Sequence, residues 1–261
     1  MDLLLYLLGG CIAGFLAGVL GIGGGLVIVP FLSIALPLSG IAPELTMHMA
    51  IGTAAAVIIC TASLSAYSHY RHQGLEWPML YDLLPGLLLG ALIGGLIGNF
   101  LSGILLKIIF AFFVIFMALK MGFNLSLHDR STLPSKKITF LICSIMGSLC
   151  AMLGMGGGVF IIPFLRSCQL KMLKAVGIAA ACAVPVSIIS TLSYIVGGFN
   201  NAHLPAWSLG YVYLPALLGC ALASMCMVPL GAKLAHRLPA ALLQKVFAIF
   251  LFVVAVNMLF F

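Results

Sequence analysis

The residues with the clearest potential for binding chemistry are the glycines of two similar runs. Gly21-Ile22-Gly23-Gly24-Gly25 and Gly154-Met155-Gly156-Gly157-Gly158 are each followed by four apolar residues and then by Pro-Phe-Leu. The runs lie 133 residues apart, about half the chain, and each interrupts an apolar segment. Such breaks at matching positions of two halves are typical of a binding site built on discontinuous helices. The candidate binding glycines are Gly21, Gly23, Gly24, Gly25, Gly154, Gly156, Gly157 and Gly158.

The chemistry indicated by these runs is the binding of an anion. We expect a short helix to begin after each run, near Leu26 and near Val159. The first N–H groups of a helix have no partner within the helix, and that end carries a partial positive charge that favours anions. The alternative is that glycines only let helices pack closely, which we favour for Gly94, Gly95 and Gly98. A nucleotide-phosphate loop is disfavoured, because no Lys followed by Ser or Thr comes after either run.

Hydroxyl and titratable side chains add candidates for the same site. Thr53, Ser187 and Thr191 can offer hydroxyl groups to an oxyanion, and hydrogen bonds between helices are the alternative explanation for Ser187 and Thr191. His48 and Asp82 are candidates for proton coupling, since both are titratable and lie in or beside apolar segments. For both residues the alternative is a polar side chain near the membrane interface.

Metal, disulfide and catalytic chemistry are not indicated. His69 and His72 have the spacing of metal ligands, but they fall in a short basic loop, and the eight cysteines form no Cys-x-x-Cys pair. Most of the cysteines lie in apolar segments, where we expect them to pack as small hydrophobic residues. We therefore expect no enzyme, no cofactor, no catalytic residue and no bound metal.

The elements that position these residues are expected to be membrane helices. Of the 261 residues, 64% are hydrophobic and 7% are charged, and a fold in water needs a larger polar surface than this composition provides. Apolar stretches long enough to cross a bilayer fill most of the chain. We predict an all-α polytopic membrane protein with apolar segments at 3–38, 47–66, 79–99, 103–123, 138–165, 173–196, 208–229 and 240–260.

The repeat extends beyond the glycines. The phrase Ala50-Ile51-Gly52-Thr53-Ala54 matches Ala175-Val176-Gly177-Ile178-Ala179, and Trp77 matches Trp207. Matching phrases in the same order indicate that a whole half was duplicated. We predict a first transmembrane repeat at 1–123, a linker at 124–137 and a second repeat at 138–261. Each repeat is expected to be a glycine-broken helical hairpin followed by three transmembrane helices.

The positions of lysine and arginine predict how the two halves sit in the membrane. If every apolar segment crossed once, the twelve basic residues would divide almost evenly between the two sides. If each glycine-broken segment instead enters and returns to one side, eleven of the twelve fall on one face, with Lys107 as the exception. Cytoplasmic loops show this bias. We therefore predict two inverted repeats, with the basic loops in the cytoplasm and both chain ends on the opposite side.

These features resemble the sulfite exporter TauE/SafE family, also called the toluene-sulfonate uptake permease family. The resemblance covers essentially the whole chain. It rests on the apolar-Gly-x-Gly-Gly-Gly-x-x-x-x-Pro opening of each half and on the phrase at 50–53 with its echo at 175–178. It implies transport of sulfur-containing anions such as sulfite, sulfonates or sulfoacetate. The second half has Ile178 and Ala179 where the family often has Thr and Ser, so the hydroxyl is kept only at Thr53.

The sequence is thus interpreted as a secondary transporter that binds a small anion at the membrane midplane, between inverted repeats. The expected partners are the anion and the lipid of a bacterial inner membrane. A homodimer is compatible with the sequence, and no nucleic acid is expected. Two alternatives stay open: a divalent metal-ion permease, and a non-transport subunit of a membrane complex. A metal permease would need ligands inside the apolar segments, whereas most of the histidines fall in loops or at segment ends.

Overall fold

The computed structural model of the chain is built almost wholly from α-helices. It describes residues 2–20, 24–71, 74–122, 134–199, 201–235 and 240–260. Four of the described helices are long and apolar enough to cross a membrane. They are α3 (Pro43–Arg71), α4 (Trp77–Phe100), α8 (Met172–Gly198) and the first 18 residues of α9 (Leu214–Ala235). The predicted all-α polytopic membrane architecture is confirmed.

The same order of helices occurs twice along the chain. In the first half, α1 (Asp2–Leu20) and the short α2 (Gly25–Leu38) flank the first glycine run, and α3, α4 and α5 (Gly103–Gly122) follow. In the second half, α6 (Lys136–Met152) and the short α7 (Gly158–Ser167) flank the second run, and α8, α9 and α10 (Ala240–Phe260) follow. Both short helices begin within one residue of the predicted starts. Residues 124–133 of the predicted linker (124–137) lie outside the described residues.

The start of α9 differs in kind from the sequence prediction. The apolar segment expected to begin at 208 starts instead with a small hairpin of β1 (Ser208–Leu209) and β2 (Val212–Tyr213), and α9 begins after it. Gly210, between the strands, has a φ of 55°, a left-handed conformation that a right-handed helix does not contain. The N–H of Tyr211 donates to the carbonyl oxygen of Tyr194 at 3.1 Å, which anchors the hairpin on α8. Because these residues are also apolar, hydropathy does not separate them from the helix that follows.

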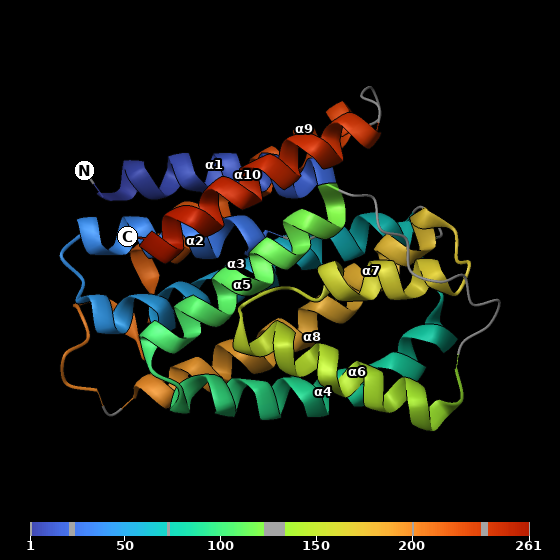
Figure 1. Cartoon of the computed structure of the whole chain (residues 1–261), viewed down its shortest axis with the longest axis horizontal. Coiled ribbons are helices and arrows are strands. Elements are labelled where there is room, and N and C mark those ends of the chain that lie inside the picture. The colour runs from blue at the N-terminus through green and yellow to red at the C-terminus, as the bar shows by residue number, and fades with distance from the viewer. Residues whose placement is uncertain are drawn as a thin grey trace.

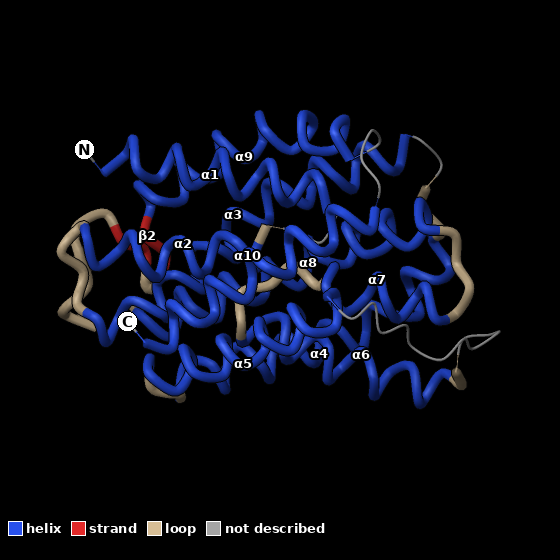
Figure 2. The backbone as a smooth tube through the Cα atoms, turned by 45° about the horizontal axis from the view of Figure 1, so that its top comes forward, coloured by secondary structure: helices blue, strands red, loops and turns tan. Residues whose placement is uncertain are grey.

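The helices run along the long axis of the molecule, so the bundle has two distinct ends (Figure 1). The start of α1, the end of α10, the α2–α3 turn and the β hairpin lie at one end, which we call the terminal end (Figures 1 and 2). The α3–α4 and α7–α8 connections and the start of α6 lie at the opposite end, which we call the basic end. Helices α1 and α2 therefore form a hairpin that opens to the terminal end, and α6 and α7 form one that opens to the basic end (Figure 1). The described basic residues at or beside the connections of the basic end are Arg71, Lys136, Lys137, Arg166, Lys171 and Lys174.

The two halves interleave. Helix α1 packs along α9, α4 along α6, α3 along α8 and α5 along α10. By their order in the two halves, α1 corresponds to α6 and α4 to α9, so the α1–α9 and α6–α4 pairs are equivalent. Helix α3 corresponds to α8 and α5 to α10, so each of these two pairs joins corresponding helices. The largest helix contacts are therefore made between the halves, and the main hydrophobic core contains residues of both.

Glycines spaced four residues apart let these helices approach closely. On α1 the glycines face the backbone of α9, and on α4 they face the backbone of α6. A Cβ atom at any of them would overlap a backbone atom of the partner helix, which is the small-residue packing typical of membrane helices. Gly95 and Gly98 pack instead against side chains of α8. The close-packed glycines are Gly10, Gly14 and Gly18 on α1, and Gly86, Gly90 and Gly94 on α4.

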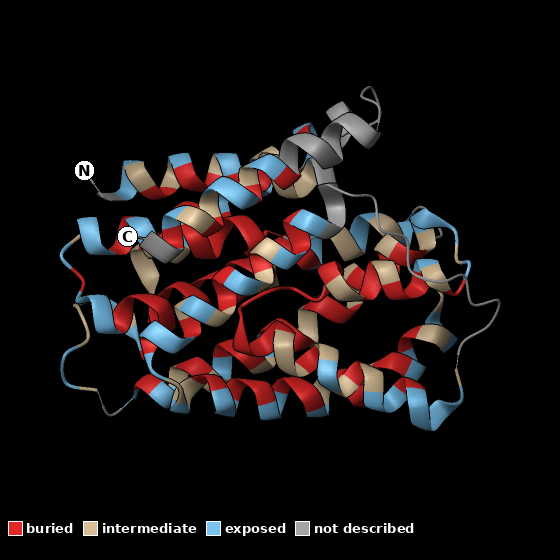
Figure 3. Ribbon diagram, viewed as in Figure 1, coloured by how far each residue is buried: buried red, intermediate tan, exposed pale blue. Residues whose placement is uncertain are grey.

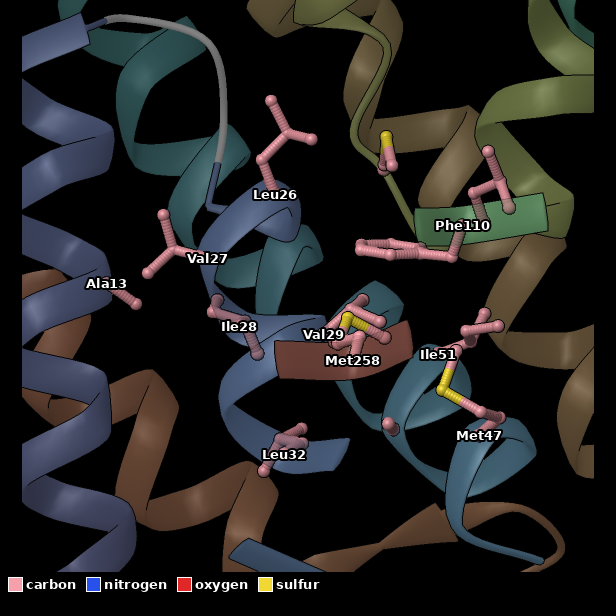
Figure 4. Close-up of a cluster of buried hydrophobic side chains, with 14 of the residues drawn as sticks. Ala13, Leu26, Val27, Ile28, Val29, Leu32, Met47, Ile51, Phe110 and Met258 are labelled. Atoms are coloured by element: carbon pink, nitrogen blue, oxygen red, sulfur yellow. The ribbon is translucent and has the colours of Figure 1, made fainter. Parts of the chain in front are cut away.

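Burial separates an apolar interior from an apolar outer surface (Figure 3). Inside, Leu26 and Ile28 of α2 lie near Met47 and Ile51 of α3 and Phe110 of α5 (Figure 4). Outside, the helices expose many large apolar side chains, such as those of Leu92, Phe112 and Leu222. A surface of this kind marks a region that contacts lipid.

Candidate functional site

The two glycine-rich turns meet inside the bundle. Helix α2 starts at Gly25 and runs toward the terminal end, and α7 starts at Gly158 and runs toward the basic end, so both helix starts lie in the interior (Figure 1). A Cβ atom on Gly25 would lie 2.5 Å from the carbonyl oxygen of Gly154 and 2.9 Å from the Cα atom of Met155. Only glycine fits at this position, because the backbone of one turn fills the space of a side chain on the other.

The two turns also have matching surroundings. A Cβ atom on Gly24 would meet the Cδ1 atom of Ile28 at 2.8 Å, and one on Gly157 would meet the Cδ1 atom of Ile161 at 3.0 Å. These equivalent residues are 133 apart in the chain, as the glycine runs are. The turns differ in backbone conformation, since Gly24 has a φ of −69° and Gly157 a φ of 79°. The duplicated sequence therefore produces nearly duplicated local packing.

At each helix start, two backbone N–H groups have no backbone acceptor within the described residues. The N–H groups of Val27 and Ile28 donate to the carbonyl oxygen of Gly24, and those of Phe160 and Ile161 donate to that of Gly157. Within the described residues, the two preceding N–H groups of each helix have no backbone acceptor. These four groups belong to Gly25, Leu26, Gly158 and Val159.

A cavity of about 60 Å³ lies against both turns. Gly24 lines it from the first turn, and Gly156 and Gly158 line it from the second. Among the described lining residues there is no ionisable side chain, and the polar side chains are the hydroxyls of Thr61 and Ser65. Residues that line the cavity from the surrounding helices are Ala17, Ile58, Thr61, Ser65, Ala180 and Val228.

Sequence reasoning did not identify Thr61 and Ser65. Thr61 is buried, and its Oγ1 lies 3.4 Å from the carbonyl oxygens of Val57 and Ile58 in its own helix, whereas Ser65 is half-buried. The lining positions 58, 61, 62 and 65 follow the helical spacing of three and four residues, so they share one face of α3. That spacing was the available signal, but it indicates a face without showing which face meets the glycine turns.

The comparison with known protein families matches the chain to one family, described as sulfite exporter TauE/SafE, over residues 6–258. The chain belongs to the TauE/SafE family. It is 40% identical over 260 residues to a probable membrane transporter protein of Haemophilus influenzae, covering 98% of this chain and 97% of that one. It is 27% identical over 231 residues to a probable membrane transporter protein of Methanocaldococcus jannaschii, covering 88% of this chain and 85% of that one. No solved structure matches the chain. The chain is therefore a membrane protein of a transporter family.

Six of the eight candidate glycines of this TauE/SafE protein lie within the described residues, and all six are at the junction of the two turns. Gly24, Gly156 and Gly158 line the cavity, Gly25 and Gly154 make the contact between the turns, and Gly157 precedes α7. Gly21 and Gly23 lie outside the described residues.

The three candidate hydroxyls are not among the cavity-lining residues. Thr53 is fully buried, and its Oγ1 accepts a hydrogen bond from the N–H of Tyr213 at 3.0 Å, which ties the β hairpin to α3. Ser187 is buried on α8. The Thr191 hydroxyl is buried without a hydrogen-bond partner among the described residues. A part for these three hydroxyls in substrate binding stays a prediction.

The two candidates for proton coupling lie toward opposite ends of the TauE/SafE bundle. His48 is buried near the start of α3, where its Nε2 lies 3.0 Å from the carbonyl oxygen of Leu101 and its ring stacks on Tyr211 with 4.9 Å between centroids. Asp82 is exposed near the start of α4, next to Tyr81. Neither side chain is among those lining the cavity. Because the two residues lie toward opposite ends of the bundle, their placement does not support direct proton exchange between them.

No cluster of three or more His, Cys, Asp or Glu side chains suited to a metal ion occurs in the described parts of the chain. His72, the second residue of the metal-like pair, lies outside them.

Proposed function

We propose that this TauE/SafE protein is a secondary transporter of a small sulfur-containing anion, of the sulfite, sulfonate or sulfoacetate type. The observation that carries the proposal is that α2 and α7 both start in the interior of the bundle (Figure 1), where their glycine turns line one cavity. The family description supports a sulfur-containing substrate, and the relatives are described as probable membrane transporters.

Electrostatics favours an anion at the junction of the turns. The start of a helix carries roughly +0.5 of an elementary charge, so two starts together present about one positive charge. No acidic side chain among the described lining residues balances it. A bound anion would balance this charge and would accept hydrogen bonds from the N–H groups of Gly25, Leu26, Gly158 and Val159.

The size of the cavity favours a compact anion. The cavity volume of about 60 Å³ exceeds the roughly 10–15 Å³ that one water molecule needs, so the cavity has room for a small group. Sulfite, a sulfur atom with three oxygen atoms, is a group of this kind. Taurine and sulfoacetate are larger and would require the cavity to widen.

Transport would proceed by alternating access to a site that stays near the midplane. We assign the two halves to inverted repeats, because α1–α2 opens to the terminal end and α6–α7 to the basic end (Figure 1). We place the basic end in the cytoplasm of a bacterial inner membrane, following the distribution of lysine and arginine. The energy would come from an ion gradient or from the substrate gradient itself.

Flux into proteoliposomes tests this function. We expect sulfite flux above that of protein-free liposomes, weaker flux of taurine and sulfoacetate, and no competition by nickel. Ser65→Leu should abolish the flux, because the larger side chain fills the cavity from a half-buried position. The matched control is Ser68→Leu, an exposed position on the same helix. Nickel flux in place of anion flux, or normal sulfite flux in Ser65→Leu, would refute the proposal.

A further inference from the structure

Ser65 on α3 and Ser190 on α8 occupy equivalent positions in the two halves. They are 125 residues apart, and so are Gly52 and Gly177 of the repeated phrase. The equivalence also holds in space. A Cβ atom on Gly52 would contact the side chain of Tyr194, one helical turn after Ser190, and a Cβ atom on Gly177 would contact that of His69, one turn after Ser65. Any difference between the two serines is therefore a difference between the two ends of the bundle.

At the terminal end, Ser190 closes the contact between α8 and α6. Ser190 is 1% exposed, and its hydroxyl donates to the carbonyl oxygen of Ala151 at 2.9 Å. One turn later, the Tyr194 hydroxyl donates to the carbonyl oxygen of Met152, also at 2.9 Å. These two bonds join α8 to the last turn of α6, immediately before the second glycine turn.

At the basic end, the equivalent contact is open. The repeat spacing of 133 residues makes Gly18 on α1 the equivalent of Ala151. Ser65 makes no hydrogen bond to α1 within the described residues; it is half-buried and lines the cavity together with Ala17. Ala180 of α8, a half-buried lining residue near the start of its helix, lies on the same side. The half-buried lining residues Ser65 and Ala180 thus lie toward the basic end, whereas the equivalent serine toward the terminal end is buried and hydrogen-bonded.

We propose that Ser65 and Ser190 are the two gate hydroxyls of this transporter, used in alternation. In the present conformation the Ser190 gate is closed and the Ser65 gate is open. In the opposite conformation Ser65 donates to the carbonyl oxygen of Gly18, and the bond from Ser190 to Ala151 is broken. Because the two gates are equivalent, each end of the bundle in the second conformation adopts the arrangement that the other end has now. This proposal rests on the transport function proposed above and names residues of its conformational change.

Ser187 provides a reporter for the opposite conformation. It is equivalent to Ala62, which lines the cavity now, but Ser187 itself is buried. When the terminal end opens, Ser187 should line the cavity in turn. A Ser187→Cys variant, made after the eight native cysteines are replaced, should therefore react with a membrane-impermeant thiol reagent from the terminal side only in that conformation.

The test compares the rate of this reaction in gate variants, without any substrate. Ser190→Ala removes the closing bond, so the rate should rise roughly two- to tenfold. Tyr194→Phe should raise it as well. Ser65→Ala should lower the rate by a similar factor, because it removes the bond of the opposite conformation. The exposed Ser68→Ala is the control and should leave the rate unchanged.

Unchanged rates in both gate variants, or changes in the same direction, would overturn the gate proposal, provided that each variant elutes as a folded species in detergent. The assay measures the reaction of a cysteine and needs no transported solute. Its outcome therefore does not depend on whether the protein transports sulfite. The gate proposal and the substrate proposal are therefore refuted by different results.

Discussion

Gly157 offers the most direct test of anion binding by the helix starts. Its φ is 79°, and its carbonyl oxygen accepts the N–H groups of Phe160 and Ile161 at 3.0 and 2.9 Å, so it sets the direction of the first turn of α7. Alanine in this left-handed conformation costs about 1–2 kcal/mol. We expect Gly157→Ala to relieve that strain by changing the directions of the N–H groups of Gly158 and Val159, which we propose hold the anion.

The expected loss of affinity follows from the hydrogen bonds involved. A hydrogen bond to a charged group contributes about 1.5–3 kcal/mol. The loss of one such bond at the start of α7 weakens anion binding by roughly 10- to 150-fold. Titration calorimetry with sulfite on the detergent-purified protein would measure this change.

Gly40 supplies a matched control for the backbone strain. It has a φ of 82°, it lies in the α2–α3 turn at the terminal end, and a Cβ atom there would meet nothing within 4 Å. Gly40→Ala should therefore lower the melting temperature through backbone strain alone while leaving the affinity for sulfite unchanged. The reasoning is refuted if the folded Gly157→Ala variant has an affinity for sulfite within about twofold of that of Gly40→Ala. Such a difference is far below the loss expected for one hydrogen bond, so the helix starts would not hold the anion.

Three further predictions concern topology, packing and proton coupling. Single cysteines at Lys136 and Lys171 should both react with an impermeant reagent from the cytoplasmic side, because α6 and α7 form a hairpin between them; labelling from opposite sides would contradict the hairpin topology. Gly90→Leu should lower the melting temperature sharply, because a Cβ atom there already overlaps a backbone carbonyl of α6, and an unchanged melting temperature would contradict that packing. One of His48→Gln and Asp82→Asn should flatten the pH dependence of sulfite flux, and unchanged pH profiles in both would remove them from any proton path.

Local features of the sequence were sufficient to predict the helices and the breaks between them. Hydropathy indicated the membrane environment, because composition alone shows that the chain cannot cover its apolar surface in water. The glycine runs marked the interruptions, and α2 and α7 begin one residue before Leu26 and Val159 as a result. The prediction was wrong at Ser208, where an apolar hairpin precedes α9, since hydropathy does not report the sign of φ.

The candidate site was predicted only in part, for a physical reason. The glycines could be identified because their absent side chains and their repetition are visible in the sequence. Thr61 and Ser65 could not, because their relevance depends on the face of α3 that meets the glycine turns. Conversely, Thr53 stood out in a repeated phrase, but its hydroxyl anchors a hairpin that is 160 residues away in the chain.

The sequence by itself determined that this protein lies in a membrane, which helices it forms, that its glycine motif is repeated and to which family it belongs. These properties depend on composition, on local periodicity and on repeated phrases. Only the tertiary structure decided which helices pair across the halves, where the two turns enclose a cavity and which gate is closed. These properties arise from contacts between residues far apart in the chain, such as Ser190 with Ala151 and Gly25 with Gly154. A repeated sequence specifies both gates equally, so only the packing of one particular conformation can make the two ends of the bundle different.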